Sequence, residues 1–423
     1  MRSERRPRAD RLLVCGLIVP PGRVGGLQLA ISHLASGLES LGWSVDLAIT
    51  PDALGIPLDD HTRDRLASWT SPRWSRLPRM HFVRGDTRRL LQHAALDGGA
   101  ARVHSRAMSR LAARLRERPY DAVLAVVGHM IPGFARFVTS AHPNVVLVSL
   151  DGLAFELRAR RRLEAIRLSA KLRRARLDPL AYRAVDTQSI RSVVFASESW
   201  KRQAVNAGLP SDRAETIYFG IATCPKLEPL GPVGNRLLWV GRASLEKGLH
   251  HFIEAVACLR RSMPVTLTAI CAQGPGAYRG RLRDLIERHA LQDAVRLLPP
   301  VPHSELPQFY RTHDTLLFDS PFAEPVALVV LEAFAHGLPV VARASANSGP
   351  LLVPGSTCEA FRSSDPREIA EAVSRSLRDT KARDRMRTAA YEIVAGRFSM
   401  AEAARRYDAV LRRAMRRPDG AGA

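Results

Sequence analysis

The chain has 423 residues, of which 46% are hydrophobic and 25% are charged. At about 150 residues per domain, this length suits two or three globular domains, and the composition excludes a disordered or fibrous protein. No stretch reaches the roughly 18 consecutive apolar residues that a membrane-spanning helix needs, so the sequence excludes an integral membrane protein.

The N-terminal residues resemble a secretory signal only in part. Arginines in residues 1–11 precede the apolar run 12–19, but Pro20, Pro21 and Gly22 follow where a cleavage site needs small residues. We therefore expect a cytoplasmic protein whose first strand begins near Leu12. The five cysteines are odd in number, stand far apart and form no C-x-x-C pair. We expect neither a disulfide framework nor a zinc site, and no bound metal.

Positive charge is concentrated in the first half of the chain. The formal net charge is +22, and residues 1–210 hold 34 basic and 18 acidic groups, a net charge of +16. Arginines recur every four residues over 102–118, which predicts a helix with one basic face, and residues 158–176 add nine basic residues. Such a field suits an anionic membrane surface or a phosphorylated substrate. The alternative is that Arg stems only cover helix faces.

Nucleic acid is the least favoured anionic partner. Aromatic residues make up 6% of the chain, and no alternation of basic and aromatic residues and no zinc-finger spacing occurs.

Short apolar stretches alternate with helical ones along the first half of the chain. Five of them predict strands, at residues 12–19, 44–50, 121–127, 145–150 and 193–196. Apolar strands separated by helices are typical of a doubly wound parallel sheet.

A second alternating block follows a segment rich in Pro and Gly. That block predicts strands at 236–240, 265–270, 294–298, 315–318 and 338–342. The expected parts are a first domain over 1–210, a linker over 211–234, a second domain over 235–395, and a final segment over 396–423 with a helix near 401–415. The fold class is therefore α/β, with two Rossmann-like doubly wound domains.

Ligands of open parallel sheets bind beyond the carboxyl ends of strands, beside helix N-termini. Gly25 and Gly26 stand between the first strand and the helix expected over 27–41, where paired glycines let backbone N–H groups approach a phosphate. The alternative is an ordinary strand-to-helix turn. Because neither G-x-G-x-x-G nor G-x-x-x-x-G-K-[ST] occurs, a nicotinamide dehydrogenase and a P-loop enzyme lose their main support.

The second candidate is the loop after the strand 236–240. Gly241 ends the strand, and Arg242 and Lys247 follow, five residues apart, before the helix expected over 250–259. Two cations at this position can neutralise a diphosphate. Because the chain has 63 basic residues, a pair of them means little by itself. The prediction of a diphosphate site therefore depends on the position of this pair directly after a buried strand.

The third candidate is a pair of carboxylates around a helix start. Glu324 stands at the mouth of a helix and Glu332 within it, eight residues later and at most about 12 Å away if the segment is helical. Two carboxylates so placed can accept hydrogen bonds from the hydroxyls of a sugar and of a ribose, while helix N–H groups face a phosphate. The alternative is a Glu that caps its own helix and a second Glu paired with an Arg.

These three motifs, in this order, resemble the retaining family 4 glycosyltransferases (glycosyl transferases group 1), which have the GT-B fold. The resemblance implies two Rossmann-like domains facing each other across a cleft, a nucleotide-diphosphate sugar as co-substrate, and no required cofactor or metal. Arg242 and Lys247 match the pair that stabilises the departing diphosphate, and Glu324 and Glu332 match the residues that bind the donor sugar and the ribose. The matched donor-binding set also holds further positions: Gly25, Gly26, Val326, Ala327 and Leu328.

The resemblance extends to the acceptor side and to the C-terminus. His129, just past a strand, stands where the family has its active-site histidine, although a structural histidine is the alternative. Asp151 either contacts the acceptor or caps the next helix. The family's last helix crosses back to the first domain, which implies the same for residues 401–415.

Three positions depart from the family pattern. The family usually has glycine where Ala327 stands, asparagine where Phe219 stands, and an acidic turn where residues 348–352 stand. These departures leave open the identity of the donor and the level of activity.

We therefore expect a retaining hexosyltransferase that moves a sugar from a nucleotide-diphosphate sugar to a hydroxyl acceptor. The acceptor is expected to be lipid-linked or a saccharide, in glycolipid or envelope polysaccharide synthesis, with the basic first domain on the anionic inner face of the plasma membrane. A catalytically weak relative that binds a sugar or a scaffold is the alternative. A GT-B epimerase is disfavoured by the spacing of Glu324 and Glu332.

Overall fold

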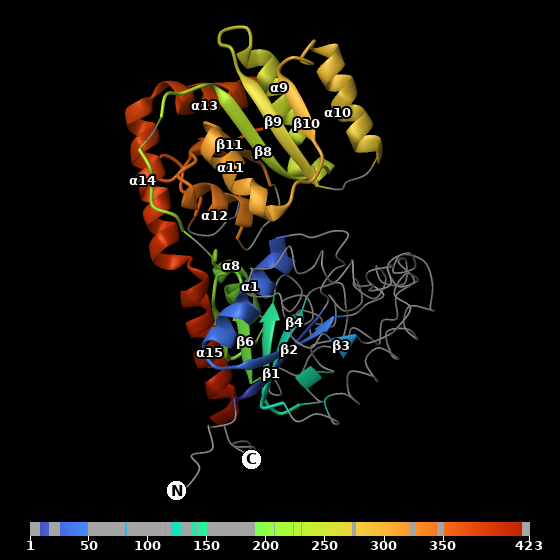
Figure 1. Ribbon diagram of the computed structural model, residues 1–423, viewed down its shortest axis with the longest axis vertical. Coiled ribbons are helices and arrows are strands. Elements are labelled where there is room, and N and C mark those ends of the chain that lie inside the picture. Colours follow the sequence, from blue (N-terminus) through green and yellow to red (C-terminus); the bar gives the residue numbers. More distant parts are fainter. Residues whose placement is uncertain are drawn as a thin grey trace, which may run out of the picture. The chain divides into compact units, whose positions relative to one another are not determined.

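The computed structural model describes residues 9–16, 26–49, 81–82, 115, 120–127, 138–139, 142–149, 191–206, 208–222, 224–229, 231–272, 276–320, 326–344 and 351–416 (Figure 1). The chain divides into two compact units, Met1–Tyr218 together with Ala403–Ala423, and Phe219–Glu402. The division between Tyr218 and Phe219 falls inside the segment expected as a linker. The basic segments 102–118 and 158–176 lie outside the described residues, apart from position 115.

The first unit contains a parallel sheet of seven described strands in the order β3-β2-β1-β4-β5-β6-β7. The strands are β1 (Arg11–Gly16), β2 (Ser44–Ile49), β3 (His81–Phe82), β4 (Ala122–Val127), β5 (Val145–Ser149), β6 (Ser192–Phe195) and β7 (Ala214–Thr216). Its described helices include α1 (Gly26–Ser40), α8 (Glu198–Asn206) and the 3-10 turn η4 (Ser211–Arg213). The order reverses between β1 and β4, which defines a doubly wound sheet.

The central strands of this sheet are largely buried in the described residues. All five residues of β5 are buried, and so are Leu12, Leu13 and Val14 of β1. Parallel strands covered on both faces read as continuous apolar runs, which is why the sequence located them.

The helix α15 (Met400–Arg416) enters the first unit at Ala403. Its Tyr407 and Leu411 are fully buried. Asp408 accepts a hydrogen bond of 2.7 Å from Trp43 Nε1, and Arg412 pairs with Asp10 at 3.2 Å. Apolar burial and polar contacts together fix this C-terminal helix to elements near the N-terminus.

The second unit repeats the same topology with six described strands in the order β10-β9-β8-β11-β12-β13, again all parallel. The strands are β8 (Arg236–Arg242), β9 (Thr266–Ala272), β10 (Val295–Leu298), β11 (Thr315–Phe318), β12 (Val340–Arg343) and β13 (Glu359–Phe361). The helices are α9 (Leu249–Leu259), α10 (Gly276–Arg288), α11 (Leu306–Thr312), α12 (Leu328–Ala335), α13 (Pro366–Arg378) and α14 (Thr380–Arg397), with the 3-10 turns η5 (Leu245–Lys247) and η6 (His303–Glu305). The predicted α/β class with two doubly wound sheets is confirmed.

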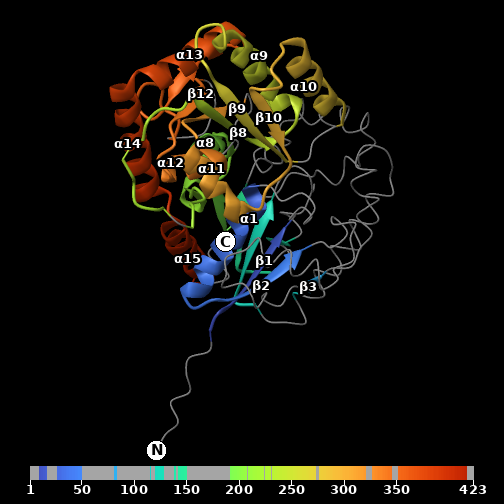
Figure 2. The same ribbon diagram turned by 45° about the horizontal axis from the view of Figure 1, so that its top comes forward.

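The helices of the second unit lie on both faces of its sheet. Helices α9, α10 and α13 pack together on one side, and α11, α12 and α14 lie on the other (Figure 2). This arrangement follows from right-handed crossovers that leave β8 and β11 toward opposite faces.

Three strands were not predicted, because β3, β7 and β13 have only two or three residues and show no pattern of their own. Residues 214–216, expected in the linker, form β7 and pair with β6, since Ala214 lies in register with Val193.

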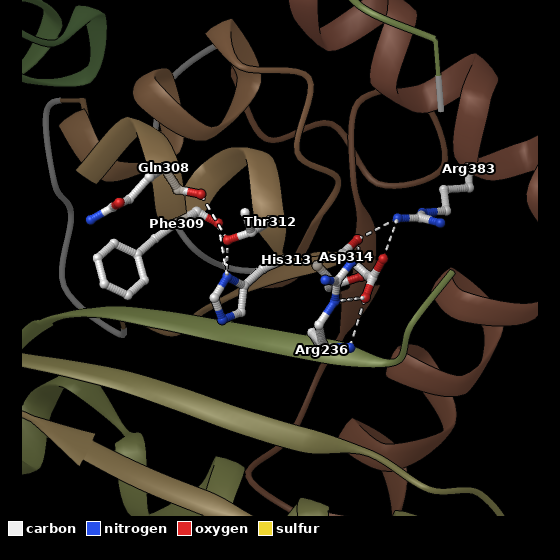
Figure 3. A network of polar contacts seen from close by, with 8 residues as sticks. Arg236, Gln308, Phe309, Thr312, His313, Asp314 and Arg383 are labelled. Atoms are coloured by element: carbon white, nitrogen blue, oxygen red, sulfur yellow. Dashed lines mark hydrogen bonds and ion pairs between the residues drawn. The ribbon is translucent and has the colours of Figure 1, made fainter. Parts of the chain in front are cut away.

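A polar network holds the amino ends of β8 and β11 (Figure 3). Asp314, immediately before β11, accepts hydrogen bonds from the backbone N–H of Arg236 at 2.8 Å and from its Nε at 3.2 Å. Arg383 of α14 donates to the backbone oxygen of Asp314 at 2.7 Å, with its guanidinium 3.9 Å from the carboxylate. The side chains of Asp314 and Arg383 are at most 5% exposed, so their contact connects α14 to the sheet inside the protein.

Among the helices that the structure describes, none combines the length and the apolar character that crossing a bilayer requires.

Candidate functional site

The order of the second sheet reverses between β8 and β11. These neighbouring strands are parallel, with Leu238 in register with Leu316, and their connections lead to helices on opposite faces. At such a switch point the loops after the two strands diverge, and this is where open α/β sheets bind ligands. The relevant residues are those between β8 and α9 and those after β11.

Two cations stand on the loop after β8. Arg242 ends the strand with a side chain that is 59% exposed, and it donates to Glu246 at 3.0 Å. Lys247 ends the turn η5 and is half-buried. The pKa of its ammonium is lowered to about 8, first by burial and then by the charge of Arg242. The carboxylates of Glu246 and Asp319 act in the opposite direction. An anion bound here relieves the unfavourable burial of positive charge.

Gly248 joins this loop to α9 in a way that only glycine satisfies. Its φ of 64° lies in the left-handed region, where other residues are strained. A Cβ at this position would also lie 2.6 Å from Oδ2 of Asp319. The backbone of the cation-bearing loop therefore lies directly against a carboxylate at the end of β11.

The negative charge of Asp319 is compensated by an arginine in a buried ion pair. Arg343, the last residue of β12, donates from Nε to Oδ1 at 2.6 Å and from Nη2 to Oδ2 at 2.8 Å. Burial alone would raise the pKa of Asp319, but the hydrogen bonds and charges of Arg343 and His251 lower it below its ordinary value. The His251 Nδ1 lies 3.4 Å from Oδ2. Because Arg343 compensates Asp319, the charge presented by the neighbouring loop stays positive.

Glu332 lies in α12 and has two side-chain partners. Its Oε1 lies 2.7 Å from Nε2 of His303, and its Oε2 accepts a hydrogen bond of 2.6 Å from the hydroxyl of Tyr310. The Glu332 side chain is 14% exposed. The alternative expected from the sequence was a Glu paired with an Arg, and among the described contacts Glu332 has no such pair. The partners stand 29 and 22 residues earlier in the chain, a separation that no sequence pattern links to Glu332.

The first turn of α12 begins at Leu328 with Ala327 as its N-cap. No side chain caps this end, so its first N–H groups have no side-chain acceptor among the described contacts. Val326 and Ala327 are buried. Backbone N–H groups at a helix start are suited to an anion, as expected for residues 326–328.

Several residues named from the sequence lie outside the described residues: Gly25, His129, Asp151 and Glu324. Gly26 is the first residue of α1. Of the departing turn 348–352, Leu351 and Leu352 are described and buried. The structure thus brings Arg242, Lys247 and the α12 start to neighbouring strands of one sheet, and it adds four residues that the sequence analysis missed: Asp319, Arg343, His303 and Tyr310.

Residues 230–393 match the family described as Glycosyl transferases group 1. The chain is 33% identical over 162 residues to glycogen synthase from Mycobacterium tuberculosis, a match that covers 38% of each protein. It is 30% identical over 167 residues to alpha-D-kanosaminyltransferase from Streptomyces kanamyceticus, covering 40% of this chain and 42% of that protein. The chain thus spans about two fifths of the length of the curated relatives it matches.

Solved structures resemble almost the whole chain. HepE from Anabaena, in complex with UDP and glucose, has a TM-score of 0.66 at 18% identity and covers 96% of this chain and 100% of that one. Sucrose-phosphate synthase from Thermosynechococcus elongatus has a TM-score of 0.70 at 17% identity and covers 96% and 98%. The fold is therefore GT-B-like. The match to the glycosyl transferases group 1 family lies entirely within the second unit.

We predict that Gly248→Ala destabilises the protein more than Gly355→Ala does. Gly355 also has a positive φ, 76°, but a Cβ there would meet no atom within 4 Å. The control substitution should therefore cost only the backbone strain, about 1–2 kcal/mol of the free energy of unfolding. Gly248→Ala should cost more, because its Cβ also displaces Asp319. Chemical denaturation of both variants measures the difference, and equal losses would contradict the close approach.

Proposed function

We propose that the protein is a retaining hexosyltransferase that moves a sugar from a nucleotide-diphosphate sugar to a hydroxyl acceptor. The observation that carries this proposal is the pair of cations on the loop after β8, at the switch point of the second sheet. The neighbouring strand β11 leads to the start of α12, which no side chain caps. The family match over residues 230–393 and the UDP-glucose complexes of a protein with the same fold support it.

In this proposal the second unit binds the donor. Arg242 and Lys247 stabilise the diphosphate, which gains charge as the bond to the sugar breaks. Glu332 accepts hydrogen bonds from the ribose, and Glu324 from the donor sugar. Backbone N–H groups near residues 326–328 face a phosphate.

The first unit supplies the remaining groups of the reaction. Gly25 and Gly26 approach the donor, His129 contacts the transferred sugar, and Asp151 contacts the acceptor. The bond from the anomeric carbon to the diphosphate oxygen breaks, and a bond from that carbon to the acceptor oxygen forms on the same face. The hydroxyl proton leaves to the nucleotide diphosphate or to water.

The acceptor and the cellular location extend the same proposal. The net charge of +16 over residues 1–210 supports docking of a cytoplasmic enzyme on an anionic inner membrane, where lipid-linked or polysaccharide acceptors of envelope synthesis lie.

We predict that the full chain co-sediments with vesicles containing anionic lipid and not with neutral vesicles at low salt. Added salt should release it, because screening weakens attraction between exposed charges. Equal sedimentation with both vesicle types would contradict electrostatic docking.

Ala327 favours a second candidate function. It stands where the family usually has glycine, and it caps the helix whose N–H groups would face the donor. A relative that binds a sugar or scaffold without turnover would show donor binding and no product with any acceptor, which distinguishes it from an enzyme.

We predict that one series of sugar nucleotides raises the melting temperature of the wild type. A ligand that binds only the folded state stabilises it by about 2.7 kcal/mol at 100 times its dissociation constant. UDP-, GDP- and ADP-glucose are the probes, with NAD as a control ligand. Glu332→Ala should weaken the shift, whereas Glu359→Ala, which removes a carboxylate paired with Arg375 in the same unit, should leave it unchanged. No shift with any sugar nucleotide would contradict the proposed donor site.

We further predict that donor affinity falls as the pH rises through about 8. Lys247 binds a diphosphate only when protonated, and its pKa in the free protein is about 8. Affinity should be highest below that pH and fall above it by up to about tenfold per pH unit. Calorimetric titration with the donor that binds measures this dependence, and proton uptake on binding should accompany it. In Lys247→Arg the dependence should vanish, because a guanidinium stays charged. A flat wild-type profile would contradict the role of Lys247.

A further inference from the structure

We propose that His303 and Tyr310 are positioning residues. They hold the Glu332 carboxylate in the orientation in which it accepts hydrogen bonds from the two hydroxyls of the donor ribose. This inference rests on the proposed function and deepens it, because it makes the discrimination between ribose and deoxyribose depend on two residues outside the donor motifs.

The geometry fixes both oxygens of one carboxylate from two directions. His303 comes from the turn η6 and reaches Oε1 at 2.7 Å, and Tyr310 comes from α11 and reaches Oε2 at 2.6 Å. Tyr310 is 2% exposed, so its ring is held by packing, while the His303 side chain is 35% exposed and lies at the surface. A side chain with three rotatable bonds is thereby restricted to one orientation.

Both partners are placed to donate a hydrogen bond to the Glu332 carboxylate. Burial and the adjacent charge of Glu332 raise the pKa of Tyr310 well above its ordinary value, so its hydroxyl keeps its proton. Burial alone would lower the pKa of His303, but the hydrogen bond and charge of Glu332 raise it above its ordinary value. The nearby His336 has a pKa lowered by burial and by the charge of Arg311, against a hydrogen bond to the backbone oxygen of Glu332 that raises it. The hydrogen bond and charge of Glu332 therefore favour the protonated form of His303, whereas burial favours the neutral form of His336.

With these two donors in place, the Glu332 carboxylate can still accept further hydrogen bonds. Each carboxylate oxygen can accept about two hydrogen bonds, and the described contacts give each oxygen one side-chain donor. One further hydrogen bond per oxygen remains, which matches the adjacent 2′ and 3′ hydroxyls of a ribose. If either donor is lost, the carboxylate can rotate and the match to both hydroxyls is lost.

The test compares dissociation constants for ribonucleoside and 2′-deoxyribonucleoside diphosphates. The probes are UDP, GDP and ADP with their 2′-deoxy forms, and the series that binds the wild type is taken forward. Tyr310→Phe keeps the ring and removes the hydroxyl, His303→Leu removes the donor, and His303→Gln keeps an amide donor near the place of Nε2. Tyr278→Phe is the matched control, because Tyr278 is a buried tyrosine of the same unit whose hydroxyl bonds to His250 at 2.9 Å instead.

The expected result is a change in discrimination. Tyr310→Phe and His303→Leu should weaken binding of the ribonucleotide by about tenfold, the lower end of what losing an orienting hydrogen bond costs at metal sites. Binding of the 2′-deoxy form should weaken less, because it has only the 3′ hydroxyl to lose, so that the preference for ribose falls. His303→Gln and Tyr278→Phe should keep the wild-type preference.

Two results would overturn the inference. An unchanged preference for ribose in both Tyr310→Phe and His303→Leu would show that neither residue orients Glu332. An equal loss of affinity for both sugars, together with a lower melting temperature, would show a structural role only. If the wild type binds none of the nucleotides, the proposed function itself is contradicted. If the variants bind normally with an unchanged preference for ribose, only this inference is contradicted.

Discussion

The ion pair between Asp319 and Arg343 is the interaction on which the candidate donor site depends. It joins the carboxyl ends of β11 and β12 in a place where Asp319 is 2% exposed. A carboxylate so buried is tolerated only with a partner, and the two hydrogen bonds from one guanidinium supply it. Without Arg343, a negative charge would stand beside the loop that is proposed to bind a diphosphate.

The neighbouring loop is shaped around this pair. Gly248 has a left-handed backbone and no Cβ, so the loop approaches Asp319 closely, and Lys247 becomes buried enough to lower its pKa. Burial and the charge of Arg242 disfavour the protonated form of Lys247, and a bound anion would favour it. This is the physical link between the packing of this loop and the proposed binding of a donor.

Ion pairs at the two ends of the same sheet serve different purposes. Asp314, Arg236 and Arg383 connect the amino ends of β8 and β11 to α14, on the side away from the switch point. Asp314 and Arg383 are buried, but Arg383 donates to the backbone oxygen of Asp314 and does not form two hydrogen bonds with its carboxylate as Arg343 does with Asp319. The loop before β11 leads from α11 into the strand and not from a strand to a helix start. Position in the topology, rather than the chemistry of the pair, distinguishes a contact that holds the fold from one that shapes a site.

The sequence by itself determined the α/β class, ten of the strands and the loop that carries Arg242 and Lys247. It did so because parallel strands buried on both faces are continuous apolar runs, and because Gly and Pro mark their ends. Strands of two or three residues left no such pattern. Only the tertiary structure decided that Glu332 meets His303 and Tyr310, and that Asp319 meets Arg343. These partners stand between 22 and 29 residues apart along the chain, and they meet because parallel crossovers return each strand beside a neighbour, a pairing that local sequence does not encode.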